Sequence, residues 1–242
     1  MKAKYYLHIL LLLLITQACT KNEKRLLVFS KTEGFRHQSI EAGKEFFLKF
    51  GIENNYAVDT TEDASIFTEV NLKQYSAIIF LNTTGDILNT DQQNSFESYI
   101  QAGGGFVGIH AASDTEYDWP WYGKLMGGWF NGHPSDPNVR KGKVTVLDKN
   151  HPATESLPDS WEKTDEFYNF KSLNTEMNFL ISVDEKSYGA GKHGDFHPLS
   201  WYHDFDGGRA FYTNFGHTPE TFSEKEFIEH ITGGIAYAVG NE

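Results

Sequence analysis

Continuous apolar segments and segments with helical spacing follow one another along the first half of the chain, a pattern typical of α/β proteins. Short runs of aliphatic and aromatic residues predict buried strands over 25–30, 56–59, 75–81 and 106–109. Between them, the spacing of apolar residues predicts helices over 39–50 and 91–102 and a short helix within 61–70. Because the strands are apolar on both faces and alternate with helices, we expect an open, mainly parallel sheet with helices on both faces.

The second half of the chain has a different pattern after about residue 115. Strand-like segments separated by turns lie over 139–147, 161–170, 179–183, 199–203 and 209–215. They predict additional, partly antiparallel strands. Residues 224–239 have the spacing of a closing amphipathic helix, on which His230 is expected at the surface. Composition does not change abruptly, so a single domain is predicted over 25–242.

The N-terminus resembles a bacterial lipoprotein signal sequence. A basic start precedes an apolar run over 5–15 that is too short to span a membrane as a mature helix. Small Ala18 stands before Cys19, the only cysteine of the chain. We expect a signal peptide over 1–18, a lipidated Cys19, and a tether over 19–24 that anchors the domain to the cell envelope, facing the periplasm or the cell surface. The alternative is an ordinary cleaved signal peptide with an incidental cysteine.

Composition narrows the range of partners. The formal net charge of −12 argues against nucleic acid and anionic lipid as ligands, since a surface of this sign repels phosphate. Aromatic residues make up 15% of the chain, and all five tryptophans lie between 119 and 201. Such rings fill a core, but together with Asp and His they also suit a sugar, which has apolar faces and hydroxyl edges.

The most informative segment is a glycine run, 103–105, followed by a short strand and a histidine at 110. Gly108-Ile109-His110-Ala111-Ala112 resembles a nucleophile elbow, the tight strand-to-helix turn that raises one side chain above a sheet. Hydrolases of that plan carry serine or cysteine at the raised position. Here the residue is His110, so the scaffold favours catalysis while the usual covalent chemistry is excluded. A serine hydrolase using Ser113 is a weaker alternative, because no Gly-x-Ser-x-Gly is present.

Ligands of open α/β sheets bind beyond the carboxyl ends of the strands. Three predicted loops lie there, over 33–38, 82–86 and 110–121. Their polar residues are Arg36, His37, Asp86, His110, Asp114 and Asp118. Polar groups gathered at one edge of a sheet are what a binding pocket requires.

The chain also resembles the ThuA-like (trehalose utilisation) family from about residue 25 to 240. The resemblance is carried by segments 34–37, 103–110, 127–134, 151–152, 165–168, 197–201 and 208–217. It implies a fold similar to class I glutamine amidotransferases, in which a cysteine occupies the elbow. His110 replaces that cysteine, so glutaminase activity is not expected. The family is associated with uptake and breakdown of disaccharides, including keto-sugar intermediates, by a reaction that the resemblance does not define.

Two residues are the candidates for proton transfer. His110 stands at the elbow, and its ordinary pKa near neutrality suits proton transfer or metal ligation. Glu166 begins an aromatic strand segment in which alternation places Glu166, Tyr168 and Phe170 on one face and Asp165 on the other. An exposed strand carboxylate is the alternative for Glu166.

Further residues are candidates for substrate binding, each with a structural alternative. The set is Arg36, His37, Asp114, His133, Tyr168, His197, Trp201, Arg209 and His217. Asp114 has the alternative of a helix N-cap, and Arg209 that of a structural salt bridge. A divalent metal held by distant His and acidic residues is an open alternative, because no local metal-ligand spacing such as His-Glu-x-x-His is present.

Two functions of different class follow. The first is an enzyme that acts on a disaccharide or keto-sugar derivative by acid–base chemistry, with metal assistance left open. The second is a lipid-anchored carbohydrate-binding protein without catalysis, favoured by the missing nucleophile and the aromatic content. The sequence leaves the substrate, the reaction and the oligomeric state undetermined.

Overall fold

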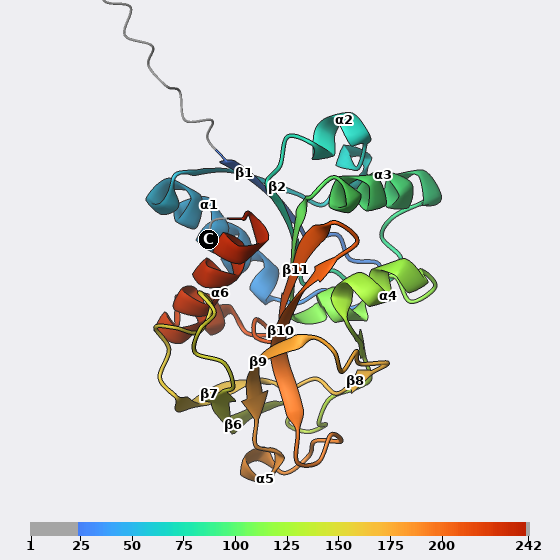
Figure 1. The fold of residues 1–242 in the computed structure, drawn as a ribbon. Coiled ribbons are helices and arrows are strands. Elements are labelled where there is room, and N and C mark those ends of the chain that lie inside the picture. The colour runs from blue at the N-terminus through green and yellow to red at the C-terminus, as the bar shows by residue number, and fades with distance from the viewer. Residues whose placement is uncertain (1–23, 241–242) are drawn as a thin grey trace, which may run out of the picture.

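The computed structural model of the protein describes residues 24–240 and is built on a nine-stranded sheet (Figure 1). The strand order is β2-β1-β3-β4-β11-β10-β9-β6-β7. The predicted α/β fold, with a parallel sheet and additional antiparallel strands, is confirmed. The predicted signal peptide, the lipidation of Cys19 and most of the tether lie outside the described residues.

The parallel half of the sheet comprises β2, β1, β3, β4 and β11. These strands are β1 (Lys24–Phe29), β2 (Tyr56–Thr61), β3 (Ala77–Leu81), β4 (Gly105–Ile109) and β11 (Gly208–Thr213). Every residue of β3 and β4 is buried, as their continuous apolar sequences predict for strands covered on both faces. The register pairs Ile109 with both Leu81 and Thr213, so the residues that follow these three strands start side by side.

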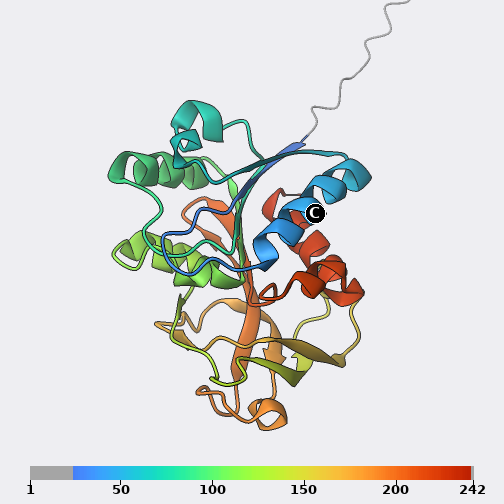
Figure 2. The same ribbon diagram turned by 180° about the vertical axis from the view of Figure 1, so that it is seen from behind.

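Helices cover both faces of the parallel half (Figures 1 and 2). The helices α1 (Ser39–Asn54) and α6 (Lys225–Ala238) pack on one face, where Phe47 and Ile231 join a shared core. The helices α3 (Thr90–Gln101) and α4 (Pro120–Met126) cover the other, with Phe96 and Tyr122 in a second core. The sheet therefore separates two apolar layers.

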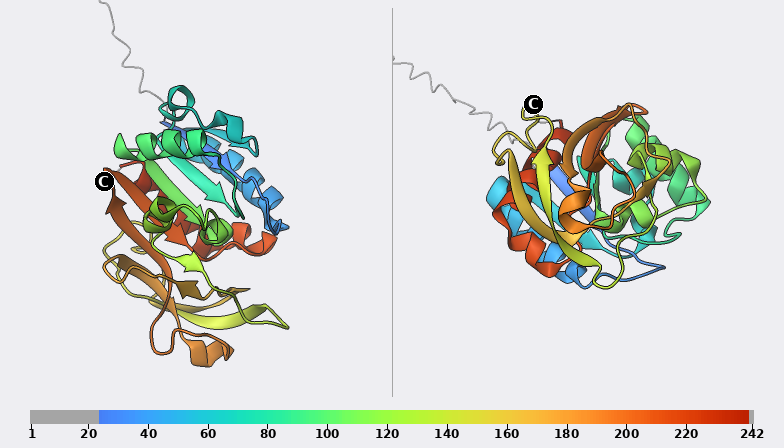
Figure 3. Two further views of the ribbon diagram at one scale, coloured as in Figure 1. Left: turned by 90° about the vertical axis from the view of Figure 1, so that its right-hand side faces the viewer. Right: turned by 90° about the horizontal axis from the view of Figure 1, so that it is seen from below.

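The antiparallel half continues the sheet beyond β11 and lies below the parallel half in the left view of Figure 3. It comprises β10 (His197–Phe205), β9 (Asn178–Val183), β6 (Val139–Val146) and β7 (Ser160–Glu166). Although β7 is the edge strand, the carboxylate of Asp165 accepts a backbone N–H from Gly216, just after β11. The antiparallel half therefore curls back over the carboxyl ends of the parallel strands.

Several element boundaries differ from the predicted ones for local reasons. The helix α1 continues past Gly51 to Asn54 and ends at Asn55, which is in the left-handed region. Asn89 forms a capping box with Gln92, so α3 starts at Thr90, one residue before the predicted start. The predicted helix within 61–70 is two short pieces, η1 (Ala64–Ile66) and α2 (Glu69–Leu72).

The predicted strand over 161–170 also divides, because β7 ends at Glu166 and β8 (Phe170–Lys171) pairs separately with β5 (Trp129–Phe130). The remaining short helices are η2 (His110–Asp114), α5 (Glu185–Tyr188) and η3 (Pro219–Ser223). Among residues 24–240, no helix combines the length and apolar character needed to cross a membrane.

His230 is fully buried on α6, which corrects the expected surface position. Its Nδ1 donates to the Ala153 carbonyl at 2.8 Å, and its Nε2 pairs with Ser200 Oγ at 2.9 Å. Both ring nitrogens are therefore satisfied inside the apolar layer, which the helical spacing could not show. Burial lowers the pKa of His230 to about 4, against an opposing contribution from the Ala153 carbonyl.

This burial predicts a loss of stability in mild acid. Since the pKa of His230 is depressed in the folded state, the unfolded chain binds its proton first as the pH falls below the ordinary value of 6.5. We expect His230 to account for about 2 kcal/mol of the decrease in unfolding free energy between pH 7.5 and pH 5. Urea unfolding of wild type and His230→Gln at both pH values measures this, and an unchanged pH dependence in the variant would contradict it.

Candidate functional site

The site begins at the turn after β4. His110 follows Ile109 with φ of +48°, and η2 continues the chain as a 3-10 helix. This is the predicted strand–turn–helix geometry, with one side chain raised at the carboxyl edge of the sheet. Gly216 crosses directly above the turn, and a Cβ on it would lie 2.8 Å from Ile109 Cγ2. Glycine at 216, with φ of +123°, therefore allows the loop after β11 to approach the elbow.

Neighbouring strands fix the orientation of His110. Because β4 and β11 pair Ile109 with Thr213, His110 lies beside Asn214, and its Nδ1 donates to the Asn214 carbonyl at 2.6 Å. The hydroxyl of Tyr212 donates to the His110 carbonyl at 2.9 Å. The ring therefore presents its other nitrogen, Nε2, to the space above the sheet.

Glu166 meets His110 Nε2 in that space. Its Oε2 lies 3.3 Å from His110 Nε2 and 2.9 Å from His217 Nδ1, and the two ring nitrogens are 3.2 Å apart. The β6–β7 register places Asn138 beside Glu166, where its amide donates to Oε1 at 2.6 Å. His133 Nδ1 lies 3.3 Å from the same oxygen. One buried carboxylate is thus contacted by three imidazoles.

His37 and Tyr168 close the other side of the site. The His37 ring lies edge-on to those of His110 and His217, with centroids 4.9 and 5.1 Å away. Its Nε2 is 3.4 Å from the Tyr168 hydroxyl, and the Tyr168 ring lies 4.2 Å from that of His110. We call His37, His110, Glu166 and His217 the histidine–glutamate cluster; one ligand atom from each lies within 4.8 Å of all the others.

The electrostatics of the cluster favour an ionised carboxylate. Burial alone raises the pKa of Glu166, but hydrogen bonds and charge from His110 and His217 outweigh it and hold the pKa far below its usual range. Burial, together with the smaller effect of the neighbouring imidazoles of His110 and His217, lowers the pKa of His37 to about 2. Neutral His37 therefore faces anionic Glu166. Solvent reaches the cluster at His217, whose side chain is 17% exposed, and at the rim through His133, which is 37% exposed.

Asp165 supports the cluster from beneath. It is fully buried, forms a 3.1 Å ion pair with Lys163, and accepts backbone N–H groups of Glu166, Gly216 and His217. Burial raises the pKa of Asp165, but the Lys163 charge and these hydrogen bonds lower it below its usual value. As strand alternation predicts, Asp165 points away from Glu166. Its carboxylate joins the end of β7 to the loop that follows β11.

A second anchor comes from Asn82, which follows β3 with φ of +51°. Its Nδ2 donates to Ser39 Oγ and to the Gly216 carbonyl, and its Oδ1 accepts the Ala111 N–H. Asn82 thereby joins the start of α1, the elbow and the loop after β11.

The structure brings together six of the residues predicted for the site. They are His37, His110, His133, Glu166, Tyr168 and His217. Asp114 lies nearby at the end of η2, but its carboxylate accepts the Tyr117 hydroxyl at 2.6 Å and caps no α-helix. Burial raises the pKa of Asp114. Arg36 lies outside the site, because its guanidinium turns to Glu41 and Glu62 at the surface.

Two further predicted substrate-binding residues are buried behind the site. His197 Nε2 donates to the Tyr168 carbonyl at 2.8 Å, and its Nδ1 lies 2.8 Å from Glu185, so it positions Tyr168 and cannot reach a ligand. Trp201 is 1% exposed in the core, where its indole N–H donates to the Met126 carbonyl. Both positions follow from β10 being a central strand of the sheet.

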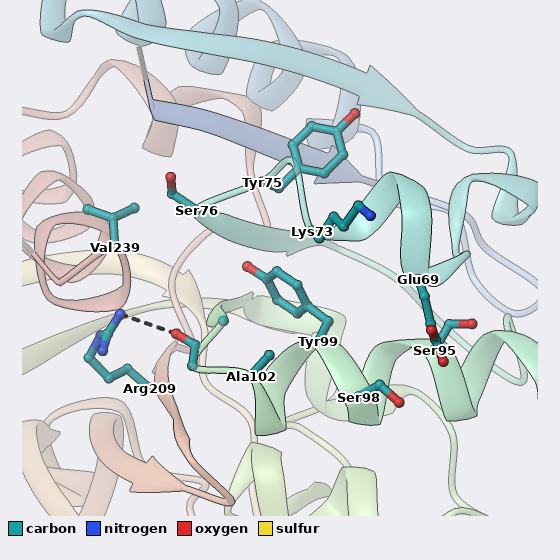
Figure 4. Close-up of a pocket in the computed structure, with 12 residues that line it drawn as sticks. Glu69, Lys73, Tyr75, Ser76, Ser95, Ser98, Tyr99, Ala102, Arg209 and Val239 are labelled. Carbon is teal, nitrogen blue, oxygen red and sulfur yellow. Dashed lines mark hydrogen bonds between the residues drawn. The ribbon is translucent and has the colours of Figure 1, made fainter. Parts of the chain in front are cut away.

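Arg209 lies at the end of the parallel strands opposite to the cluster. It stands near the start of β11, and its guanidinium donates to the carbonyls of Tyr237, Ala238 and Gly103. There it lines a cavity of about 660 Å³ with Tyr99 and Val239 (Figure 4). This cavity contains none of the cluster residues. Arg209 therefore caps the C-terminal end of α6, a structural role that it fills through backbone carbonyls and not through the salt bridge given as its alternative.

Sequence reasoning did not assign three residues that build the site. Asn138 and Asn214 contact Glu166 and His110, and Asp165 holds the loops. Asn214 acts through its backbone carbonyl, for which residue type gives no signal. Asn138 is recognisable only from the β6–β7 register.

The buried Asp165–Lys163 pair yields a prediction on stability. Asp165→Asn removes the buried ion-pair partner of Lys163 and leaves it the partly exposed Glu224 at 2.7 Å, so we expect a loss of about 3 kcal/mol in unfolding free energy. Glu224→Gln is the matched control and should cost less than about 1 kcal/mol. Denaturant unfolding of both variants checks this, and equal losses would contradict a special role for Asp165.

Comparisons with known proteins agree with this architecture. No curated protein matches the chain. A crystal structure described as a ThuA-like protein from Bacteroides uniformis has a TM-score of 0.75 at 24% identity, covering 89% of this chain and 91% of that one. One from Parabacteroides merdae has a TM-score of 0.73 at 20% identity, covering 90% and 91%. A glutamine amidotransferase from Thermotoga maritima has a TM-score of 0.51 at 13% identity, covering 90% and 98%.

These likenesses show the fold, which this chain shares with the two ThuA-like structures and, more distantly, with the glutamine amidotransferase. The family model ThuA, described as trehalose utilisation, matches residues 25–238, which is nearly all of the described chain. The protein therefore belongs to the ThuA family.

Proposed function

We propose that this protein is an enzyme of carbohydrate utilisation that acts on a disaccharide or keto-sugar derivative by acid–base chemistry at Glu166 and His110. The observation that carries the proposal is the buried Glu166 carboxylate, contacted by His110, His133 and His217 at the carboxyl edge of the parallel strands. The family's description as trehalose utilisation supports a small sugar as the ligand.

The geometry suits the movement of a proton. Glu166 Oε2, His110 Nε2 and His217 Nδ1 lie within 2.9–3.3 Å of one another, which is hydrogen-bond reach for a shared proton. Keto-sugars carry C–H groups next to a carbonyl and hydroxyl groups next to those, so one base and one acid at this spacing can remove and return protons. His133, at the exposed rim, is placed to contact substrate oxygens.

Aromatic side chains beside the cluster suit a sugar ring. Phe35 is 65% exposed, and its ring lies 4.8 Å from that of His37. On the other side, the Phe130 ring lies 4.3 Å from that of Tyr168 and stacks on His133. An exposed ring next to polar groups offers a stacking surface for the apolar face of a sugar.

The likeness to an amidotransferase does not extend to its chemistry. The elbow position holds His110, and the only cysteine is Cys19, outside the domain. No thiol is available to form a covalent acyl intermediate there. Ser113 is buried, and its hydroxyl bonds to the His110 carbonyl and Tyr212, so a serine hydrolase is not supported.

The cellular location of the protein is also part of the proposal. The basic and apolar start of the sequence and the Ala18-Cys19 pair support a lipid-anchored domain in the bacterial cell envelope. Labelling with a radioactive fatty acid, lost in Cys19→Ser, would support this address, and an unlabelled wild type would refute it.

Turnover of keto-disaccharides by purified protein tests the proposed function. We expect Glu166→Gln and His110→Ala to lower kcat/KM by about 10²–10⁴-fold, because each removes a proton-transfer group. Phe196→Ala, at an exposed phenylalanine that packs on Phe179, should keep wild-type rates. Equal rates in all variants would remove these residues from the mechanism. Tight calorimetric binding of an unmodified glycan that is recovered intact would instead favour a binding protein.

A second prediction concerns Phe35. Since its ring is exposed beside His37 and forms none of the contacts to Glu166, Phe35→Ala should raise KM about 10-fold and leave kcat within about twofold. Steady-state kinetics with the same Phe196→Ala control separates the two parameters. A fall in kcat at constant KM would show that Phe35 acts in the chemical step and not in binding.

A further inference from the structure

We infer that the histidine–glutamate cluster is a binding site for one divalent transition-metal ion, ligated by His37, His110, Glu166 and His217. The inference deepens the proposed function and rests on it for the role of the ion. The binding of the ion stands on the geometry alone.

The separations between donor atoms match those around a metal. Bonds of about 2.0–2.1 Å to a tetrahedral ion place neighbouring ligand atoms about 3.3 Å apart. Three such separations are present: 3.2 Å between His110 Nε2 and His217 Nδ1, and 3.3 and 2.9 Å from these atoms to Glu166 Oε2. A nitrogen of His37 completes the set, within 4.8 Å of each. These four ligand atoms surround a space that one ion can occupy.

The surrounding hydrogen bonds orient the ligands as in metal sites. Metal-binding histidines donate their other ring N–H to a carbonyl or carboxylate, which fixes the tautomer. His110 does this through Nδ1 and the Asn214 carbonyl, leaving the lone pair of Nε2 for the cluster. Asn138 and His133 occupy Oε1 of Glu166, so Oε2 is the oxygen left for the ion.

His37 gives an independent indication. Its side chain is 4% exposed, and within residues 24–240 its Nδ1 has no hydrogen-bond partner. Buried ring nitrogens are normally satisfied, because an unpaired polar atom in the interior is costly. The contact of its Nε2 with the Tyr168 hydroxyl is long, at 3.4 Å. A ligand bond to an ion would use this otherwise weakly bonded imidazole.

The charge of the site also calls for a cation. Within residues 24–240 the ion-pair partners of Glu166 are histidines only, without a lysine or arginine. A buried carboxylate is costly unless a positive charge faces it. Three imidazole nitrogens and one carboxylate oxygen suit first-row ions from Mn²⁺ to Zn²⁺ better than Mg²⁺ or Ca²⁺, which prefer oxygen ligands. Such an ion would be able to polarise a sugar carbonyl or hydroxyl oxygen that joins the four protein ligands as a fifth.

Metal binding by the purified full chain tests the inference directly. After treatment with a chelator and dialysis, titration with ZnCl₂ and with MnCl₂ followed by calorimetry and elemental analysis should show one ion per chain. We expect His217→Ala and Glu166→Gln each to weaken binding at least about 100-fold. His203→Gln is the matched control, because His203 bonds to the Leu125 carbonyl away from the cluster. It should bind as tightly as wild type.

Thermal unfolding shows whether each variant is folded, so that a loss of binding is not mistaken for a loss of structure. The ion should raise the thermal midpoint of wild type and of His203→Gln, but not of His217→Ala. Stoichiometry near zero in wild type, or equal affinity in wild type and both cluster variants, would overturn the site. One bound ion without turnover of any sugar would keep the site and end the proposed function. Full turnover by metal-free protein would overturn the role of the ion.

Discussion

The architecture of the site depends on a single buried carboxylate, that of Asp165. It lies at the end of the edge strand β7, yet it accepts backbone N–H groups from Gly216 and His217 after the central strand β11. Lys163 supplies the compensating charge 3.1 Å away. A charge can be kept in the interior only when it is paired and hydrogen-bonded, so this contact holds the curled half of the sheet against the parallel half.

The curl explains why one site uses both halves of the sheet. The parallel half provides His37, His110 and His217 from the loops that follow β1, β4 and β11. The antiparallel half provides Glu166, and Asn138, which immediately precedes the neighbouring strand β6, donates to it. A parallel sheet alone would gather the histidines at its edge and lack the carboxylate. The acid and its imidazole partners therefore meet only where the two halves face each other.

The sequence was sufficient for the parallel half and for His37 and His110, because continuous apolar strands and strand-exit loops have local signals. The elbow at His110 was predicted from its glycines and small residues, and the structure gives it a positive φ. Glu166 and Tyr168 were paired by strand alternation, although β7 ends at Glu166 and a loop carries Tyr168 into place. They share the site for a reason that differs from the predicted one.

Other assignments needed tertiary information. Arg209 and Trp201 belong to segments that resemble the family, but their side chains serve the end of α6 and the core. What packs against the end of a strand or against one of its faces depends on the strand order and on the placement of the helices, and both are non-local. Asn138 and the backbone carbonyl of Asn214 act through register. Periodicity along a single chain does not contain this information.

The origin of the cluster in widely separated connections has a consequence for biogenesis. His37 enters near the beginning of the domain and His217 near its end, so a partly synthesised chain or a proteolytic fragment has some of these side chains without their arrangement. The same holds for a folding intermediate in which the two halves have not yet docked. The complete cluster is therefore present only after both halves of the sheet have folded and docked.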